Sequence, residues 1–270
     1  MRIPFLAVVF LVVSATLASA HYHMLLPDRH SVKSGDKVTV TYQFGHPFEH
    51  VLSDTDKPVR AVTFNPDRKS VDLLPSFEKV EVPGQDGKKV AGYRVVFQPD
   101  RRGDFTLLVE SPPVWMEDEK HFIRDVCRVV IHVEAQKGWD LAHRRDDEFT
   151  AVPMTRPYGL RAGTVFQTRI QSRDSVQPVA HLVEVERYNP IPPKVLPPDE
   201  HITFSLKTDL SGVATCSLPD PGWWAITATR QLALGKKAET KERDGKPYPV
   251  VDRATIWVPV DDKLPQKPAD

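Results

Sequence analysis

The sequence predicts an all-β protein made of two antiparallel β-sandwich domains. Short runs alternate apolar with polar residues, which is the pattern of a half-buried strand. Prolines number 25 of the 270 residues, against 13 glycines, and their spread between the apolar runs argues against long helices. Turn sequences separate the runs at short intervals, as they do in sandwiches. Together these three observations favour strands joined by fixed turns.

Strand patterns fill the first half of the chain. Residues 37–42 alternate polar with apolar side chains, and a strand with one buried face requires this period of two. Turn-forming residues occupy 34–36, 83–87 and 99–103. We expect four further strands in this half, at residues 59–64, 90–97, 105–109 and 124–133.

The strand pattern lapses between residues 136 and 156 and then returns. This stretch is irregular and contains the charged run Arg144-Arg145-Asp146-Asp147-Glu148, which is typical of a solvated linker. We therefore predict two immunoglobulin-like or transthyretin-like sandwiches, an N-terminal domain over 21–135 and a C-terminal domain over 157–260. Residues 261–270 are expected to form a loose tail. The strands expected in the second domain are residues 164–170, 181–186, 202–206, 213–218, 224–229 and 254–260.

The first twenty residues have the pattern of a secretory signal peptide. Met1-Arg2 gives a positive start, residues 3–13 are apolar, and Ala18-Ser19-Ala20 forms an Ala-x-Ala cleavage site. The apolar run is too short to span a membrane, and no second long run follows it. The sequence therefore predicts cleavage after Ala20 and export to the periplasm or cell envelope, without stable membrane insertion.

The charge balance gives no reason to expect a nucleic-acid partner. The chain has 36 basic and 36 acidic residues, and removal of Arg2 with the signal peptide leaves one net negative charge. A near-neutral protein is attracted neither to nucleic acid nor to an anionic membrane.

The chain has two cysteines, Cys127 and Cys216, each in its own strand-like run. An oxidising compartment permits a disulfide between them. Two separately buried thiols are the favoured interpretation, because single cysteines are common core residues.

Cleavage after Ala20 would expose a metal-binding pattern, His21-Tyr22-His23. A free α-amine, two imidazoles and the intervening backbone nitrogens then lie within three residues. A histidine in third position allows the peptide to wrap a square-planar Cu(II) or Ni(II) ion. In a rival arrangement the amine and imidazole of His21 chelate the ion, and a distant histidine completes a T shape. Burial of the terminus in a folded protein would favour the second arrangement.

The predicted distant ligands are His46 and His50, which flank Pro47-Phe48-Glu49. Their spacing of four would place them on one helical face, but Pro47 disfavours a helix at His46 and favours a loop at a strand end. Glu49 is expected to be a ligand or to orient an imidazole. Ni2+ and Co2+ accept imidazole and oxygen ligands without thiolate, and Cu2+ fits the same set. The alternative for His46, His50 and Glu49 is an ordinary turn residue.

Several stretches, taken in order, resemble a known family. They are His21-Tyr22-His23-Met24-Leu25-Leu26-Pro27, Phe44-Gly45-His46-Pro47-Phe48-Glu49, Gly138-Trp139-Asp140, residues 156–163, Val183-Glu184-Val185-Glu186, His201-Ile202-Thr203, Lys207-Thr208-Asp209 with Gly212, and residues 219–224.

Over about residues 21–260, the chain is similar to the NikM-like periplasmic components of nickel and cobalt uptake systems, long catalogued as a domain of unknown function. It departs from that family at the charged residues 146–148 and at His181. The resemblance implies a binding protein that captures Ni2+ or Co2+ and delivers it to the membrane components of an ABC-type transporter.

Two other functions stay open at this point. The chain contains no Gly-x-Ser-x-Gly, His-Glu-x-x-His or glycine-rich phosphate loop, so we expect no enzyme. A copper oxidase with an N-terminal histidine brace is nevertheless an alternative, because it needs only a terminal histidine and a second one nearby. A structural or adhesive protein of the cell envelope, with an incidental terminus, is the other.

Overall fold

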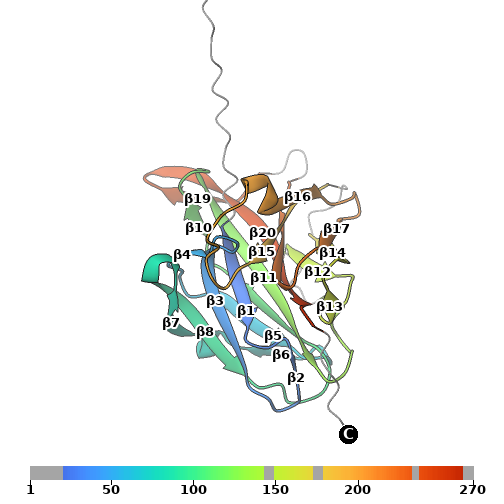
Figure 1. The fold of residues 1–270 in the computed structure, drawn as a ribbon. Coiled ribbons are helices and arrows are strands. Elements are labelled where there is room, and N and C mark those ends of the chain that lie inside the picture. The colour runs from blue at the N-terminus through green and yellow to red at the C-terminus, as the bar shows by residue number, and fades with distance from the viewer. Residues whose placement is uncertain (1–20, 143–148, 173–178, 233–236, 264–270) are drawn as a thin grey trace, which may run out of the picture.

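The computed structural model describes residues 21–142, 149–172, 179–232 and 237–263, which form almost entirely β structure (Figure 1). In these ranges the helical segments are single 3-10 turns at Leu74–Ser76, Gln85–Gly87 and Asp199–His201. None of the described helical segments is long and apolar enough to cross a membrane. The predicted all-β sandwich class is confirmed. The predicted signal peptide, the run 144–148 and most of the predicted tail lie outside the described residues.

The strands follow one another along the chain as short elements, apart from two long ones, β11 and β20. In the first half they are β1 (Tyr22–Pro27), β2 (Ser31–Val32), β3 (Val38–His46), β4 (Val51–Ser53), β5 (Arg60–Phe64), β6 (Ser70–Asp72), β7 (Glu78–Pro83), β8 (Lys89–Phe97), β9 (Phe105–Glu110), β10 (Val114–Met116) and β11 (His121–Val133). In the second half they are β12 (Thr150–Pro153), β13 (Leu160–Arg161), β14 (Thr164–Gln171), β15 (Leu182–Tyr188), β16 (Thr203–Lys207), β17 (Val213–Leu218), β18 (Gly222–Thr229), β19 (Thr240–Arg243) and β20 (Lys246–Asp261).

Three sheets are built from these strands. A small sheet has the order β1-β3-β8-β7, with β4 added to β3, and another small sheet has the order β12-β14-β17. Between them runs a large sheet with the order β16-β15-β18-β20-β11-β9-β5-β6. Neighbours are antiparallel except where β11 meets β20 and β2, and where β13 meets β20.

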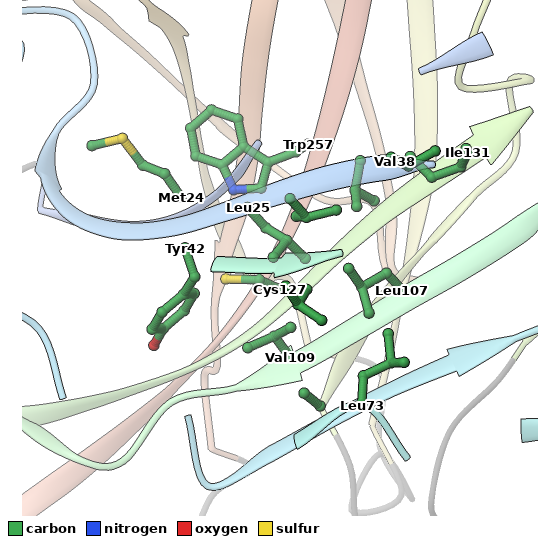
Figure 2. Packing of buried hydrophobic residues seen from close by; sticks show 14 of the residues in the cluster. Met24, Leu25, Val38, Tyr42, Leu73, Leu107, Val109, Cys127, Ile131 and Trp257 are labelled. Carbon is green, nitrogen blue, oxygen red and sulfur yellow. The ribbon is translucent and has the colours of Figure 1, made fainter. Parts of the chain in front are cut away.

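Two hydrophobic cores lie on opposite faces of β18 and β20. Trp257 belongs to the first core, with β1, β3, β9 and β11, whereas its neighbours Ile256 and Val258 belong to the second, with β14 and β17. Successive side chains of a strand point to opposite faces, so β20 packs against a different small sheet on each side. Figure 2 shows Trp257 in the first core with Leu25, Tyr42 and Cys127.

The expected strands are present, and several elements were not expected. The sequence pattern indicates a ligand-bearing peptide at the start of β1 and predicts no strand there, and β20 begins eight residues before the strand predicted at 254–260. Cys127 and Cys216 are both free thiols, as the favoured prediction of two separate thiols expects, and they do not form a disulfide. The domain boundary at 136–156 stays a prediction; strands from both sides of it share the large sheet.

Candidate metal centre

The pairing of β1 with β3 brings His21 beside His46. In this antiparallel ladder Tyr22 lies opposite Gly45 and His23 lies opposite Phe44, so His21, one residue further out, meets His46. The centroids of the two imidazole rings are 4.0 Å apart, with their planes inclined at 56°. Residues that face each other across a ladder are within side-chain contact. The two histidines that the T-shaped arrangement requires are therefore neighbours.

Burial keeps both imidazoles neutral. It is the main cause that lowers the pKa of His21 to about 4, and the nearby His46 and Arg253 lower it further. Burial also lowers the pKa of His46, although Glu49 opposes the shift. A metal ion competes with protons for imidazole nitrogens. At neutral pH these two rings are therefore uncharged, which is the form of imidazole that binds a metal ion.

Glu49, three residues after His46 in the sequence, comes near the imidazole of His46. Its Oε2 is 4.0 Å from Nδ1 of His46, which is within ion-pair range and too long for a hydrogen bond. That oxygen is buried and has no hydrogen-bond partner among the described residues. A buried carboxylate oxygen without a partner is costly, so a small movement toward His46 or toward a bound cation would be favourable.

The turn that carries Glu49 is fixed by strand β15 and the residue after it. The backbone N–H of Phe48 donates to Oε1 of Glu186 at 3.0 Å. Asn189 donates from its backbone to the carbonyl of Pro47 at 3.0 Å and from its side chain to the carbonyl of Phe48 at 2.7 Å. These bonds hold residues 47–50 as a turn, as the sequence predicts, and not as a helix.

The side chain of His50 contacts strand β7 and Tyr188. The residue adopts a left-handed backbone conformation with φ of 56°, and its Nε2 lies 3.2 Å from the carbonyl oxygen of Pro83. Its ring is buried near Tyr188, with centroids 5.8 Å apart. The structure does not bring His50 together with His21 and His46.

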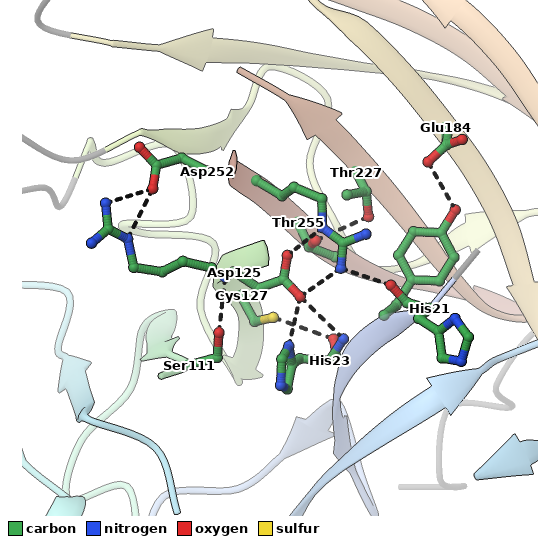
Figure 3. Close-up of polar contacts among 12 residues, drawn as sticks. His21, His23, Ser111, Asp125, Cys127, Glu184, Thr227, Asp252 and Thr255 are labelled. Atoms are coloured by element: carbon green, nitrogen blue, oxygen red, sulfur yellow. Dashed lines mark hydrogen bonds and ion pairs between the residues drawn. The ribbon is translucent and has the colours of Figure 1, made fainter. Parts of the chain in front are cut away.

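His23 is also separate from the pair, because it is part of the core. Its side chain is fully buried, and Nδ1 lies 2.6 Å from Oδ2 of Asp125. The ring stacks on Tyr42 and contacts Phe44. In Figure 3 the rings of His21 and His23 point in different directions. The square-planar mode needs the His23 imidazole and the first backbone amides, and this fold uses those groups for packing and hydrogen bonds.

Two residues of the site were not singled out from the sequence. Asp125 on β11 and Arg253 on β20 form a buried ion pair, with Nε of Arg253 2.6 Å from Oδ1 of Asp125. Arg253 also donates to the backbone carbonyl of His21 at 2.7 Å. Asp125 lies within the strand predicted at 124–133, and Arg253 directly precedes the strand predicted at 254–260. Charged residues at such positions usually face solvent, so only the three-dimensional structure shows that these two form a buried pair.

The side chains alone do not complete a metal site. Within the described ranges, no group of three or more His, Cys, Asp or Glu side chains is placed to hold a metal ion. His21 and His46 supply two imidazoles, and Glu49 adds a carboxylate at longer range. Cleavage after Ala20 would add the α-amine of His21 as a third nitrogen donor, and that donor set suits tetragonal Cu(II) or Ni(II).

Comparisons with known proteins give a family and only distant structures. Residues 18–231 match the model of a family described as a domain of unknown function (DUF4198). No curated protein matches the chain.

Among solved structures, the chain is similar to a DUF4785 family protein from Legionella pneumophila, with 8% identity, 78% of this chain and 52% of that chain covered, and a TM-score of 0.29. It is similar to the α-2-macroglobulin of Escherichia coli at 12% identity, covering 89% of this chain and 16% of that one, with a TM-score of 0.25. The adhesin InvE of Yersinia pseudotuberculosis is 10% identical over 87% of this chain and 58% of its own, with a TM-score of 0.22. The chain spans about half the length of the first of these structures. At such TM-scores the likeness carries no argument.

Proposed function

Because the chain belongs to the DUF4198 family, whose description assigns no activity, we propose a function from the site itself: an exported protein that binds a transition-metal ion at its cleaved N-terminus. The observation that carries the proposal is the contact between the imidazoles of His21 and His46, whose centroids are 4.0 Å apart. The α-amine and imidazole of His21 and the imidazole of His46 are the proposed ligands, and Glu49 supports the site.

We propose Ni2+ or Co2+ as the cargo and the membrane components of an ABC-type uptake transporter as the partner. This finer assignment rests on the resemblance to NikM-like proteins and on a ligand set without thiolate. The Irving–Williams order makes Cu2+ the tightest binder of such a site whatever its cargo. Copper binding in the test tube therefore does not identify the metal that the protein carries.

The first test is a metal titration of the protein cleaved after Ala20. We expect isothermal titration at pH 7 to show one Ni2+ or Co2+ per chain. One extra glycine before His21 converts the amine into an amide and removes a ligand, so we expect the affinity to fall by about tenfold or more, since changes around a metal commonly cost 10–100-fold. Substitution of His46 by alanine should have a similar effect.

The matched control is His201→Ala, which removes an exposed histidine in the second half of the chain. It should bind as the wild type does. If the cleaved wild-type protein binds neither Ni2+ nor Co2+, the cargo proposal fails; if the glycine extension binds equally well, the terminal amine is not a ligand.

The same His21–His46 contact favours a second candidate, a copper oxidase with a histidine brace. Such a site uses the amine and imidazole of a terminal histidine with one further imidazole. We expect the copper-loaded protein to produce peroxide in the presence of a reductant if this candidate is correct. Equal peroxide production by the glycine-extended protein would come from loosely bound copper and would reject it.

A further inference from the structure

The first residues of the described chain are held by side chains from the centre of the large sheet. Arg253 on β20 donates through Nη2 to the carbonyl of His21 at 2.7 Å. Trp257 donates through Nε1 to the carbonyl of His23 at 3.1 Å, and the thiol of Cys127 lies 3.2 Å from the same oxygen. These donors are all buried, and Figure 3 shows Asp125 and Cys127 beside His23.

Asp125 holds Arg253 in place. Its two oxygens accept from Nε and Nη2 of Arg253 at 2.6 and 2.8 Å, which is the bidentate geometry that fixes a guanidinium most firmly. The same carboxylate contacts Nδ1 of His23 at 2.6 Å, and the backbone N–H of Asp125 donates to Oγ of Ser111 at 2.9 Å. One buried carboxylate therefore ties Arg253 to the strand that begins beside the candidate site.

We infer that Arg253, held by Asp125, is a positioning residue that presets the geometry of the proposed metal site. This inference rests on the proposed function. The peptide bond is planar, so the hydrogen bond to the carbonyl of His21 fixes the plane that joins His21 to β1. Once that plane is fixed, only the ψ rotation of His21 and its side-chain torsions remain to set the positions of the terminal amine and the imidazole. Arg253 thus restricts the conformations that His21 can adopt, although Arg253 itself does not contact the ion.

The geometry gives Arg253 a role that a lysine cannot fill. The guanidinium bonds Asp125 through two nitrogens while one of them also reaches the carbonyl of His21. A lysine has a single nitrogen and no fork. Arg253→Lys keeps the buried positive charge beside Asp125 and removes the fixed link to His21.

The experiment uses the protein cleaved after Ala20 and Cu2+ alone as the probe. We expect Arg253→Lys to lower the affinity, measured by competition with a chelator, by about 10–100-fold, the usual effect of losing a residue that orients a ligand. The electron paramagnetic resonance spectrum of the copper-loaded variant should also change, because the amine and imidazoles take up a wider range of positions. A loss of stability alone would leave that spectrum unchanged.

Two further variants separate positioning from folding. Arg124→Lys changes another arginine of the large sheet, which bonds Asp252 at 2.7 and 2.8 Å and has no described contact with residues 21–23; it should keep the wild-type affinity and spectrum. Asp125→Asn keeps the shape of the carboxylate and loosens Arg253, so it should resemble Arg253→Lys. Stability of each variant is measured alongside by thermal unfolding.

The outcomes distinguish the two proposals. If the cleaved wild type gives no stoichiometric copper complex, the proposed metal site is wrong. If the wild type binds but Arg253→Lys and Asp125→Asn keep its affinity and spectrum, the site stands and the positioning role is overturned. An equal effect of Arg124→Lys would also overturn it, because the effect would then be general to the sheet.

Discussion

Asp125 is the residue on which the buried charges of the first core depend. Its side chain is fully buried, and burial by itself would raise its pKa. Arg253 and the hydrogen bond from His23 outweigh burial and hold the pKa of Asp125 well below its ordinary value. A buried charge is tolerated only when its partner and hydrogen bonds are in place.

Removal of this carboxylate should therefore be severe. We expect Asp125→Ala to lower the free energy of unfolding by about 3–5 kcal/mol, because it leaves Arg253 buried and uncompensated. Urea unfolding at neutral pH measures the change. Asp67→Ala, which removes an exposed partner of Arg101 and Lys137, is the control and should have little effect. A mild loss in Asp125→Ala would show that water reaches Arg253.

Glu186 makes stability depend on pH. Burial raises the pKa of this carboxyl to about 8, although Thr203 and the N–H of Phe48 oppose the shift. Because the folded state binds this proton more tightly than the unfolded chain does, the contribution of Glu186 to stability is greatest below its ordinary pKa of 4.5 and is lost as pH rises toward 8.

Glu186→Gln should remove this dependence. We expect the unfolding free energy of the variant, relative to the wild type, to increase steadily between pH 5 and pH 8, because glutamine never ionises. Urea unfolding of both proteins at matched pH values measures the difference. A difference that is constant with pH would mean that Glu186 is ionised at no cost.

At the scale of elements, β3 depends on Gly45 just before His46. Gly45 has φ of 146°, and a Cβ there would lie 2.2 Å from the carbonyl oxygen of Val51 on β4. Only glycine avoids both the strain and the collision. The close approach of β4 bends the chain into the turn that follows His46.

Gly45→Ala should disturb stability and the site together. We expect a loss of about 2–4 kcal/mol from backbone strain and overpacking, with weaker metal binding because His46 moves. Gly163→Ala is the matched control: its φ is also positive, at 83°, but no atom lies within 4 Å of the added Cβ. Urea unfolding and metal titration of both variants test this, and equal effects would contradict it.

The alternation of polar and apolar residues found the half-buried strands and missed β1. Burial alternates along β14 and along the first five residues of β3, whereas the first four residues of β1 are all buried. A strand enclosed on both faces has no alternation to detect. The His21–His46 contact was foreseen from the cleavage motif and the loop after residue 44, but the roles of Asp125 and Arg253 depend on a pairing between distant strands.

At the scale of the whole molecule, β20 joins the two cores. Trp257 fills the first, and Ile256 and Val258 fill the second. Sequence patterns divided the chain at 136–156 because local regularity lapses there. They could not show that β20 pairs in parallel with β11, where residue 254 lies beside residue 126. A contact between residues so far apart in the sequence leaves no local pattern.

A change in β20 should therefore be felt in both cores. We expect Trp257→Ala to lower stability by about 3–5 kcal/mol in a single unfolding transition. Hydrogen exchange should show β8 and β14, which lie in different small sheets, losing protection together. Trp115→Ala, at the half-buried edge strand β10, is the control with a smaller expected loss. Two separate transitions would show that the cores are independent.

The position of β20 also sets an order of events in folding, which bears on the export that we propose for this protein. The strand occupies the middle of the large sheet, between β11 and β18, yet it follows every other described strand in the sequence. Contacts between such distant residues form slowly, because a long loop must close first. Until residues 246–261 arrive, β11 and β18 each present an open edge. The large sheet can therefore be completed only after β20 has joined β11 and β18, so on the proposed export route the protein would fold after most of the chain has crossed the membrane.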